Sequence, residues 1–141
     1  MFKKMLLFFV LIISFLGACS QESEEPSIAK TPDITLDEVE TAITEQGLEL
    51  EKSDLPSGNV FMQELNGVKP KAYFIDGTTL SIYIFPKVDA REQGMDDFEK
   101  KTAAASLEQH KTFIVQNVLV FYAEGSEENN EKLAKAIDAL R

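Results

Sequence analysis

The chain has 141 residues, of which 24 are acidic and 14 basic, so its formal net charge at pH 7 is −10. A chain of this length accommodates one small domain, and its single cysteine excludes an intramolecular disulfide. An acidic chain is repelled by nucleic acid, and the sequence has no basic patch with interleaved aromatic residues. Composition therefore excludes a nucleic-acid-binding protein and a disulfide-stabilised scaffold.

The first eighteen residues have the three zones of a secretory signal peptide. Lys3 and Lys4 supply the basic start, residues 5–16 (MLLFFVLIISFL) are apolar except for one serine, and Gly17-Ala18 are small. A helix that spans a bilayer needs about 20 apolar residues. The apolar run is shorter and a polar segment follows it at once, so a removable leader is favoured over a permanent membrane helix.

The stretch Leu16-Gly17-Ala18-Cys19 resembles the lipobox of bacterial lipoproteins. The resemblance implies that the Cys19 thiol receives a diacylglyceryl group and that lipoprotein signal peptidase cuts between Ala18 and Cys19. The other interpretation is an ordinary signal peptide with an incidental cysteine. An exported free thiol is a liability that thioether formation removes, and two acyl chains, such as palmitate, give a stable anchor where one does not. The lipid interpretation is therefore favoured.

We accordingly predict a leader at residues 1–18, a flexible acidic tether at residues 19–33 and one domain at residues 34–141. Loss of the two lysines of the leader takes the formal charge from −10 to −12. The tether contains two prolines and too few apolar residues to fold. The predicted location is the extracytoplasmic face of the cell membrane, which the protein contacts through the lipid on Cys19.

The domain is predicted to begin with a capped helix. Thr35 and Glu38 have the spacing of a capping box, and Gly47 provides a left-handed stop. The apolar residues between them recur at helical spacing: Leu36, Val39 and Ile43. Alternation in residues 48–51 then predicts a short strand.

A β-hairpin is predicted within residues 72–86 (AYFIDGTTLSIYIFP). Asp76-Gly77 separates two β-rich runs, and Asp-Gly favours a type I′ turn because both central positions need positive φ. Residues two apart share a face of a strand, so Tyr83 and Phe85 lie opposite the aliphatic side chains of the same strand. Residues 53–71 give only weak signals.

A second helix is predicted from Asp89, where Glu92 completes a capping-box pattern, to about Gln109. His110 would then lie near its C-terminus, where the helix dipole favours a partly charged imidazole. A second hairpin follows, with a Gln116-Asn117 turn between residues 112–115 and 118–123. Ser126 caps a last helix, whose apolar residues are Leu133, Ile137 and Leu140.

These elements give the order helix, short strand, two strands, helix, two strands, helix. The simplest arrangement is an α+β fold, in which an antiparallel sheet of four to five strands carries the helices on one face. The apolar pattern of residues 74–83 recurs at residues 113–122, with an offset of 39. The recurrence indicates either a duplicated helix–hairpin unit or two hairpins of similar composition.

The sequence offers little catalytic chemistry. One histidine and one cysteine leave no Ser-His-Asp or Cys-His set, and neither a phosphate loop nor a calcium loop nor zinc-ligand spacing is present. Carboxylates gather at residues 96–99 and 124–131, and such runs on helices are usually solvated faces. We therefore predict that the protein is not an enzyme and has no metal site and no cofactor.

A binding function is the leading hypothesis. If the helices cover the aliphatic face of the sheet, the other side is exposed, and its aromatic residues form a recognition surface. The residues of this predicted surface are Tyr73, Tyr83, Phe85 and Tyr122. The other interpretation is that the first helix or residues 53–71 cover this side.

The chain as a whole resembles small lipoproteins of Gram-positive, Bacillus-type bacteria, a resemblance that implies no activity. We predict a lipid-anchored extracytoplasmic binding module whose partner is another envelope protein or a small ligand. The alternatives are a protein inhibitor, a folding accessory, or a hydrolase of envelope polymers that acts through carboxylates.

Overall fold

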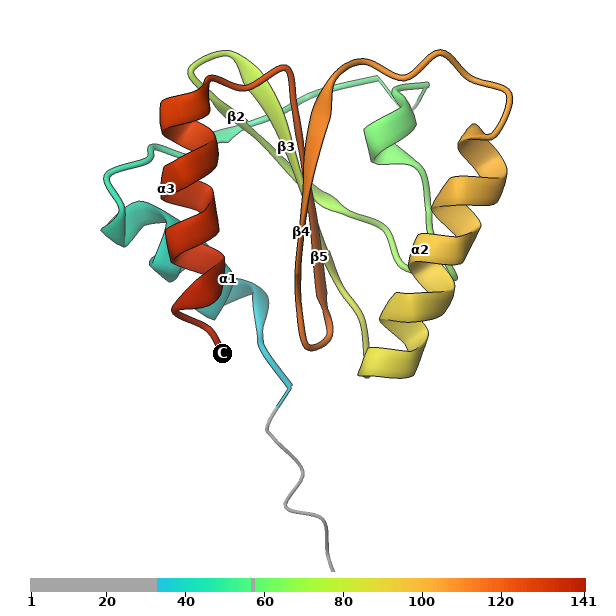
Figure 1. Cartoon of the computed structure of the whole chain (residues 1–141), viewed down its shortest axis with the longest axis horizontal. Coiled ribbons are helices and arrows are strands. Elements are labelled where there is room, and N and C mark those ends of the chain that lie inside the picture. The colour runs from blue at the N-terminus through green and yellow to red at the C-terminus, as the bar shows by residue number, and fades with distance from the viewer. Residues whose placement is uncertain (1–32, 57) are drawn as a thin grey trace, which may run out of the picture. The chain divides into compact units, whose positions relative to one another are not determined.

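An antiparallel sheet of five strands forms the centre of the fold, in the order β1-β2-β3-β5-β4 (Figure 1). The computed structural model describes residues 33–56 and 58–141. The strands are β1 (Glu51–Lys52), β2 (Lys71–Ile75), β3 (Thr78–Ile84), β4 (His110–Val115) and β5 (Val118–Ala123). The helices are α1 (Leu36–Glu45), the 3₁₀ turn η1 (Val60–Met62), α2 (Val88–Thr102) and α3 (Glu127–Asp138). The predicted α+β class and the antiparallel sheet are confirmed, and the order of elements agrees with the prediction. The predicted leader, and the predicted tether up to residue 32, lie outside the described residues.

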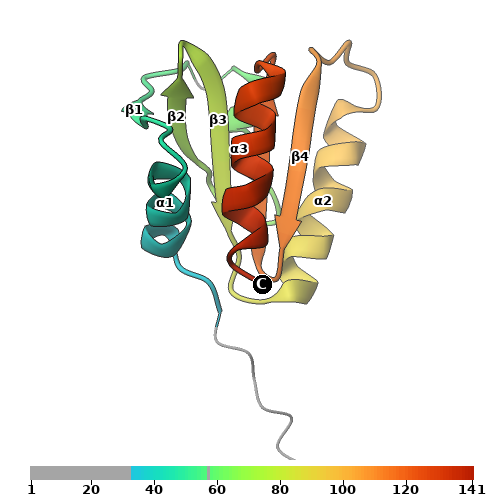
Figure 2. The same ribbon diagram turned by 60° about the vertical axis from the view of Figure 1, so that its left-hand side comes forward.

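The prediction that the helices lie on one face of the sheet is wrong. Helices α1 and α3 cover one face, whereas α2 and residues 60–68 cover the other (Figures 1 and 2). The reason lies in the central strands β3 and β5, which bury side chains on both sides. All six positions of β5 are buried, a pattern typical of a sheet covered on both faces.

The sheet therefore separates two cores. The first, the α1/α3 core, includes Val39, Ile43, Leu80, Ile82, Val120, Leu133 and Ile137. The second, the α2 core, includes Phe61, Leu65, Tyr83, Phe85, Phe98, Leu119 and Phe121. Because β3 and β5 supply side chains to both cores, these two strands hold the layers together.

Helix α1 begins as predicted. The backbone N–H of Thr35 donates to the Glu38 carboxylate at 2.7 Å, and the Glu38 N–H donates to the Thr35 hydroxyl. These hydrogen bonds to Thr35 hold the pKa of Glu38 below its ordinary value. Gly47, at φ 79°, ends the helical segment.

Helix α2 differs from the prediction at both ends. It begins at Val88 with no side-chain cap and ends at Thr102, seven residues before Gln109. Residues 103–106 are exposed and outside the helix. His110 is therefore the first residue of β4 rather than a helix cap, and its ring packs against Phe61, 5.1 Å away between ring centroids.

Both predicted hairpin turns are present. Asp76 and Gly77 have φ of 51° and 75°, and their flanking residues, Ile75 and Thr78, are paired. The second turn, Gln116-Asn117, lies between the paired Val115 and Val118. The hairpin predictions are thus confirmed, and the register puts Leu80 and Tyr83 on opposite faces of β3.

The recurrence with an offset of 39 does not correspond to a structural repeat. The residues that precede the two turns, Ile75 and Val115, are 40 positions apart. An offset shorter by one residue exchanges the faces of a strand. Accordingly Leu80 packs in the α1/α3 core and Leu119 in the α2 core. The alternative, two hairpins of similar composition, agrees with this register.

Gly77→Val is expected to lower the free energy of unfolding by about 1–3 kcal/mol, because a β-branched residue is strained at positive φ. No heavy atom lies within 4 Å of a Cβ built at Gly77, so strain rather than collision would be measured. The check is a denaturant titration of the variant beside wild type. An unchanged midpoint would contradict the prediction.

Candidate functional site

The predicted aromatic recognition surface is wrong, because all four of its residues are buried. Tyr73 is 5% exposed, Tyr83 0%, Phe85 1% and Tyr122 1%. They also lie on different faces of the sheet: Tyr73 and Tyr122 belong to the α1/α3 core, and Tyr83 and Phe85 to the α2 core. No common surface of these four side chains exists.

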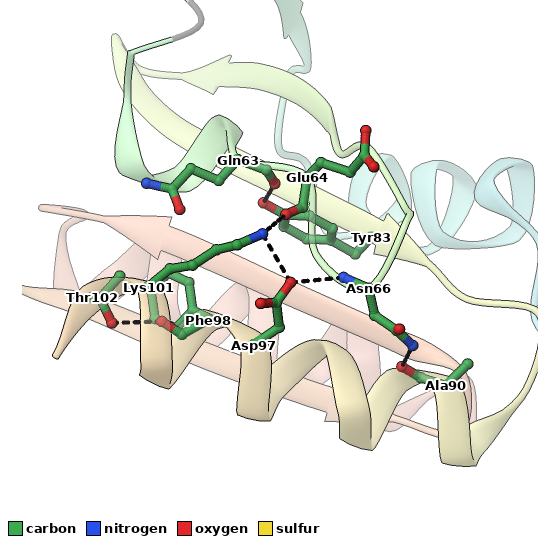
Figure 3. A network of polar contacts seen from close by, with 9 residues as sticks. All are labelled: Gln63, Glu64, Asn66, Tyr83, Ala90, Asp97, Phe98, Lys101 and Thr102. Carbon is green, nitrogen blue, oxygen red and sulfur yellow. Dashed lines mark hydrogen bonds and ion pairs between the residues drawn. The ribbon is translucent and has the colours of Figure 1, made fainter.

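Residues 60–68 and α2 cover the Tyr83 side of the sheet. This agrees with the alternative interpretation, in which a loop within residues 53–71 covers that side. The Tyr83 hydroxyl lies 2.7 Å from the carbonyl oxygen of Gln63 (Figure 3). It also lies 3.2 Å from the carbonyl oxygen of Phe61. Burial raises the pKa of Tyr83 far above its ordinary value. The hydroxyl therefore acts as a neutral donor that fastens the loop to the sheet.

The same loop is held along α2 by a polar network around Asp97 (Figure 3). The Asp97 carboxylate accepts from the Asn66 N–H and from the Lys101 ammonium, each at 2.9 Å. Lys101 also donates to the carbonyl of Glu64 at 2.6 Å. These contacts hold the pKa of Asp97 below its ordinary value, and the hydrogen bond from Asn66 has the largest effect.

Asn66-Gly67 is a turn that the sequence analysis missed. Asn66 and Gly67 have φ of 46° and 78°, and the flanking Leu65 and Val68 exchange two hydrogen bonds of 2.9 Å. Asn-Gly is the strongest short-range signal for such a turn. The dipeptide was therefore available as a signal, and it would have indicated an ordered loop between residues 53 and 71.

The stability of the fold is expected to depend on pH through Asp97. A carboxyl whose pKa is lower when folded stabilises the fold above its unfolded pKa, and this contribution is lost as the pH falls through the folded pKa. Asp97→Asn removes the contribution, so between about pH 5 and pH 3 its melting temperature should fall less than that of wild type. Thermal melts of Asp96→Asn, an exposed neighbour outside the network, provide the control. Identical pH profiles for the two variants would contradict the prediction.

The two ends of the sheet differ in character. The far end contains the Asp76-Gly77 turn and residues 124–126, and the tether end contains the Gln116-Asn117 turn and Ile34. Two hollows of about 430 and 280 Å³ lie at the far end, on either side of the first turn of α3. The larger one, here called the β4 hollow, is lined by Gln109, His110, Lys111, Tyr122, Glu124, Gly125, Glu127 and Asn130.

The β4 hollow is polar and lies at the start of β4. Glu124 has a φ of 51°, and Gly125 allows the backbone to pass directly over the ring of Tyr122. The side-chain oxygen of Asn130 is buried without a hydrogen-bond partner in residues 33–56 and 58–141. Within the same residues, Glu124 and Glu127 form no ion pair within 4.0 Å. The hollow thus contains two carboxylates, neither of them ion-paired, and one ammonium group, that of Lys111.

Asn117 defines the tether end and is the polar residue whose role the sequence analysis missed. Its side-chain oxygen accepts from the N–H of Ile34 at 2.8 Å, and its amide donates to the carbonyls of Ile34 and Phe85, each at 2.9 Å. Asn117 is 1% exposed. A single buried amide therefore joins the first residue of the predicted domain to the sheet.

None of the helices in the described part of the chain is long and apolar enough to cross a membrane. Across the same residues, no three His, Cys, Asp or Glu side chains are grouped to hold a metal ion. Comparisons with protein-family models, with curated proteins and with solved structures found no match to this chain.

Proposed function

We propose that the protein is a lipid-anchored binding module of the bacterial cell envelope, attached to the extracytoplasmic face of the membrane through Cys19. The proposal depends on the Leu16-Gly17-Ala18-Cys19 sequence for the anchor. It depends on the two ends of the sheet for the place where the anchored segment joins the domain.

The position of Ile34 is the observation that carries the proposal. Asn117 holds Ile34 at the tether end, whereas both far-end hollows adjoin the first turn of α3. Helix α3 runs between the two ends over 12 residues, or about 18 Å at 1.5 Å per residue. A chain anchored through residues N-terminal to Ile34 is therefore attached to the domain at the end of the sheet opposite both hollows.

Binding is proposed rather than catalysis because of the surroundings of His110. Its Nδ1 lies 3.0 Å from the carbonyl of Glu108, and its ring packs against Phe61, Phe98 and Phe121. These contacts give the imidazole a structural role. The far-end residues then supply shape and charge for a partner, not a reacting pair.

Cys19→Ser is expected to abolish lipid labelling and to release the protein from the membrane fraction, because Cys19 is the only thiol in the chain. Cells that express wild type or variant are grown with an alkyne fatty acid, fractionated and blotted, and mass spectrometry locates the mature N-terminus. Ser20→Ala, the adjacent change outside the lipobox, is the control and keeps the label. A variant that still takes the label, or a wild-type N-terminus other than Cys19, contradicts the proposal.

A further inference from the structure

We propose that β4 is the docking strand of this module and that an extended, basic segment of a partner protein adds to its free edge as a sixth strand. The inference rests on the proposed function, whose partner class and binding site it names.

The backbone of β4 has unused hydrogen-bonding groups. In the part of the chain that the structure describes, β4 pairs only with β5 and forms one edge of the sheet. The two residues that flank a two-residue turn exchange hydrogen bonds. Along the hairpin, such hydrogen-bonded pairs then alternate with pairs whose N–H and C=O groups point away from the partner strand. The Glu124 N–H bonds to the Gln109 carbonyl at 2.7 Å, which continues that alternation. The N–H and C=O groups of His110, Thr112 and Ile114 therefore point outward.

The β4 edge has only one of the features that usually protect an edge strand, a lysine. Its six residues (HKTFIV) contain no proline, pair without a bulge, and include one lysine. The opposite edge strand, β1, has only two residues. Of the two edges, β4 is the one long enough to pair with an added segment.

Exposed apolar side chains lie on this edge strand and at the start of α2. Ile114 and Val88, at 39% and 41% exposure, are the exposed large hydrophobic residues of the described chain. Ile114 is opposite Leu119 and so faces the α2 side of the sheet. Residues 60–66 lie along one flank of α2, at Asp97 and Lys101 (Figure 3). At about 100° per residue, Val88 is on the other flank of α2.

Charge decides between a basic partner and a second copy of this chain. Glu124 and Glu127 lie in the β4 hollow, at the start of the strand, with Lys111 as the nearby cation. Two copies of this acidic chain repel one another. A segment that alternates apolar and basic residues satisfies the outward backbone, covers Ile114 and compensates these carboxylates.

The test uses the full chain as purified from the membrane or soluble fraction, kept in detergent micelles, and a fluorescent eight-residue peptide of alternating valine and lysine. Fluorescence anisotropy at low salt should show saturable binding. Thr112→Pro removes an outward N–H and no bond to β5, so it should weaken binding at least tenfold while the melting temperature changes by only a few degrees. Lys52→Pro, the outward position of the opposite edge, is the matched control and leaves binding unchanged.

A second measurement needs no variant. On addition of the peptide, amide hydrogen exchange should slow at least tenfold at His110, Thr112 and Ile114. Three outcomes overturn the proposal: equal binding of the peptide by folded Thr112→Pro, equal binding of a valine–glutamate peptide, or protection of β4 by dimerisation in sedimentation without peptide. None of these readouts depends on where the lipid is attached, so they are distinguishable from a failure of the Cys19 prediction.

Discussion

Asn117→Ala is expected to lower the free energy of unfolding by about 3 kcal/mol or more, since each buried polar group that loses its partner costs about 1–3 kcal/mol. Three backbone groups lose their partner at once: the N–H and C=O of Ile34 and the C=O of Phe85. The N-terminal segment should then detach from the sheet before the rest of the domain unfolds.

Two measurements check the Asn117 prediction. Chemical denaturation gives the loss of stability, and amide hydrogen exchange at Ile34 should accelerate more than at Val39, in the centre of α1. Gln109→Ala, an exposed amide, is the control and should change stability by less than about 0.5 kcal/mol. A variant of Asn117 with wild-type stability would show that these hydrogen bonds contribute nothing net.

Gly125→Ala should destabilise the fold by about 3 kcal/mol, at the upper end of the usual cost of overpacking. A Cβ at this position would lie 1.7 Å from Cε1 of Tyr122. The ring has no room to move, because Tyr122 is 1% exposed and its hydroxyl contacts the side-chain amide of Asn129 at 3.2 Å. Either the backbone at residue 125 or the ring must shift.

The Gly125 prediction is tested by thermal melts beside Gly58→Ala, where a Cβ meets no atom within 4 Å. The Gly58 variant should be neutral or slightly stabilising, because alanine restricts the unfolded chain. If the collision with Tyr122 is the cause, Gly125→Ala should cost less in a Tyr122→Leu background. Equal costs in both backgrounds would rule the collision out.

The features that could be predicted from the sequence depend on short-range patterns of residues. The capping box of Thr35 and Glu38 and the Asp76-Gly77 turn depend on residues within four positions of one another, and both are present. The β-strands and their hairpins were equally accessible. The contacts between elements far apart in the chain could not be predicted, because no local sequence pattern encodes them.

Tyr83 and Asn117 show that limit most clearly. The alternation along β3 correctly separated Tyr83 from Leu80, but nothing near Tyr83 indicated that residues 60–68 would cover it. Asn117 was predicted only as a turn residue, although its amide bonds to Ile34, 83 positions away. The proposed site at β4 likewise depends on which strand ends at the edge of the sheet, a property of topology rather than of sequence pattern.

The complete burial of β5 has a consequence for the aggregation of this protein when it unfolds. Its sequence, VLVFYA, contains six successive residues without charge, proline or glycine, the composition of segments that stack into cross-β fibrils. In the fold β5 is enclosed between β3 and β4. Any event that strips β4 away exposes this segment to other copies of the chain. Destabilised variants are therefore expected to be lost to insoluble aggregate rather than to remain as unfolded monomers.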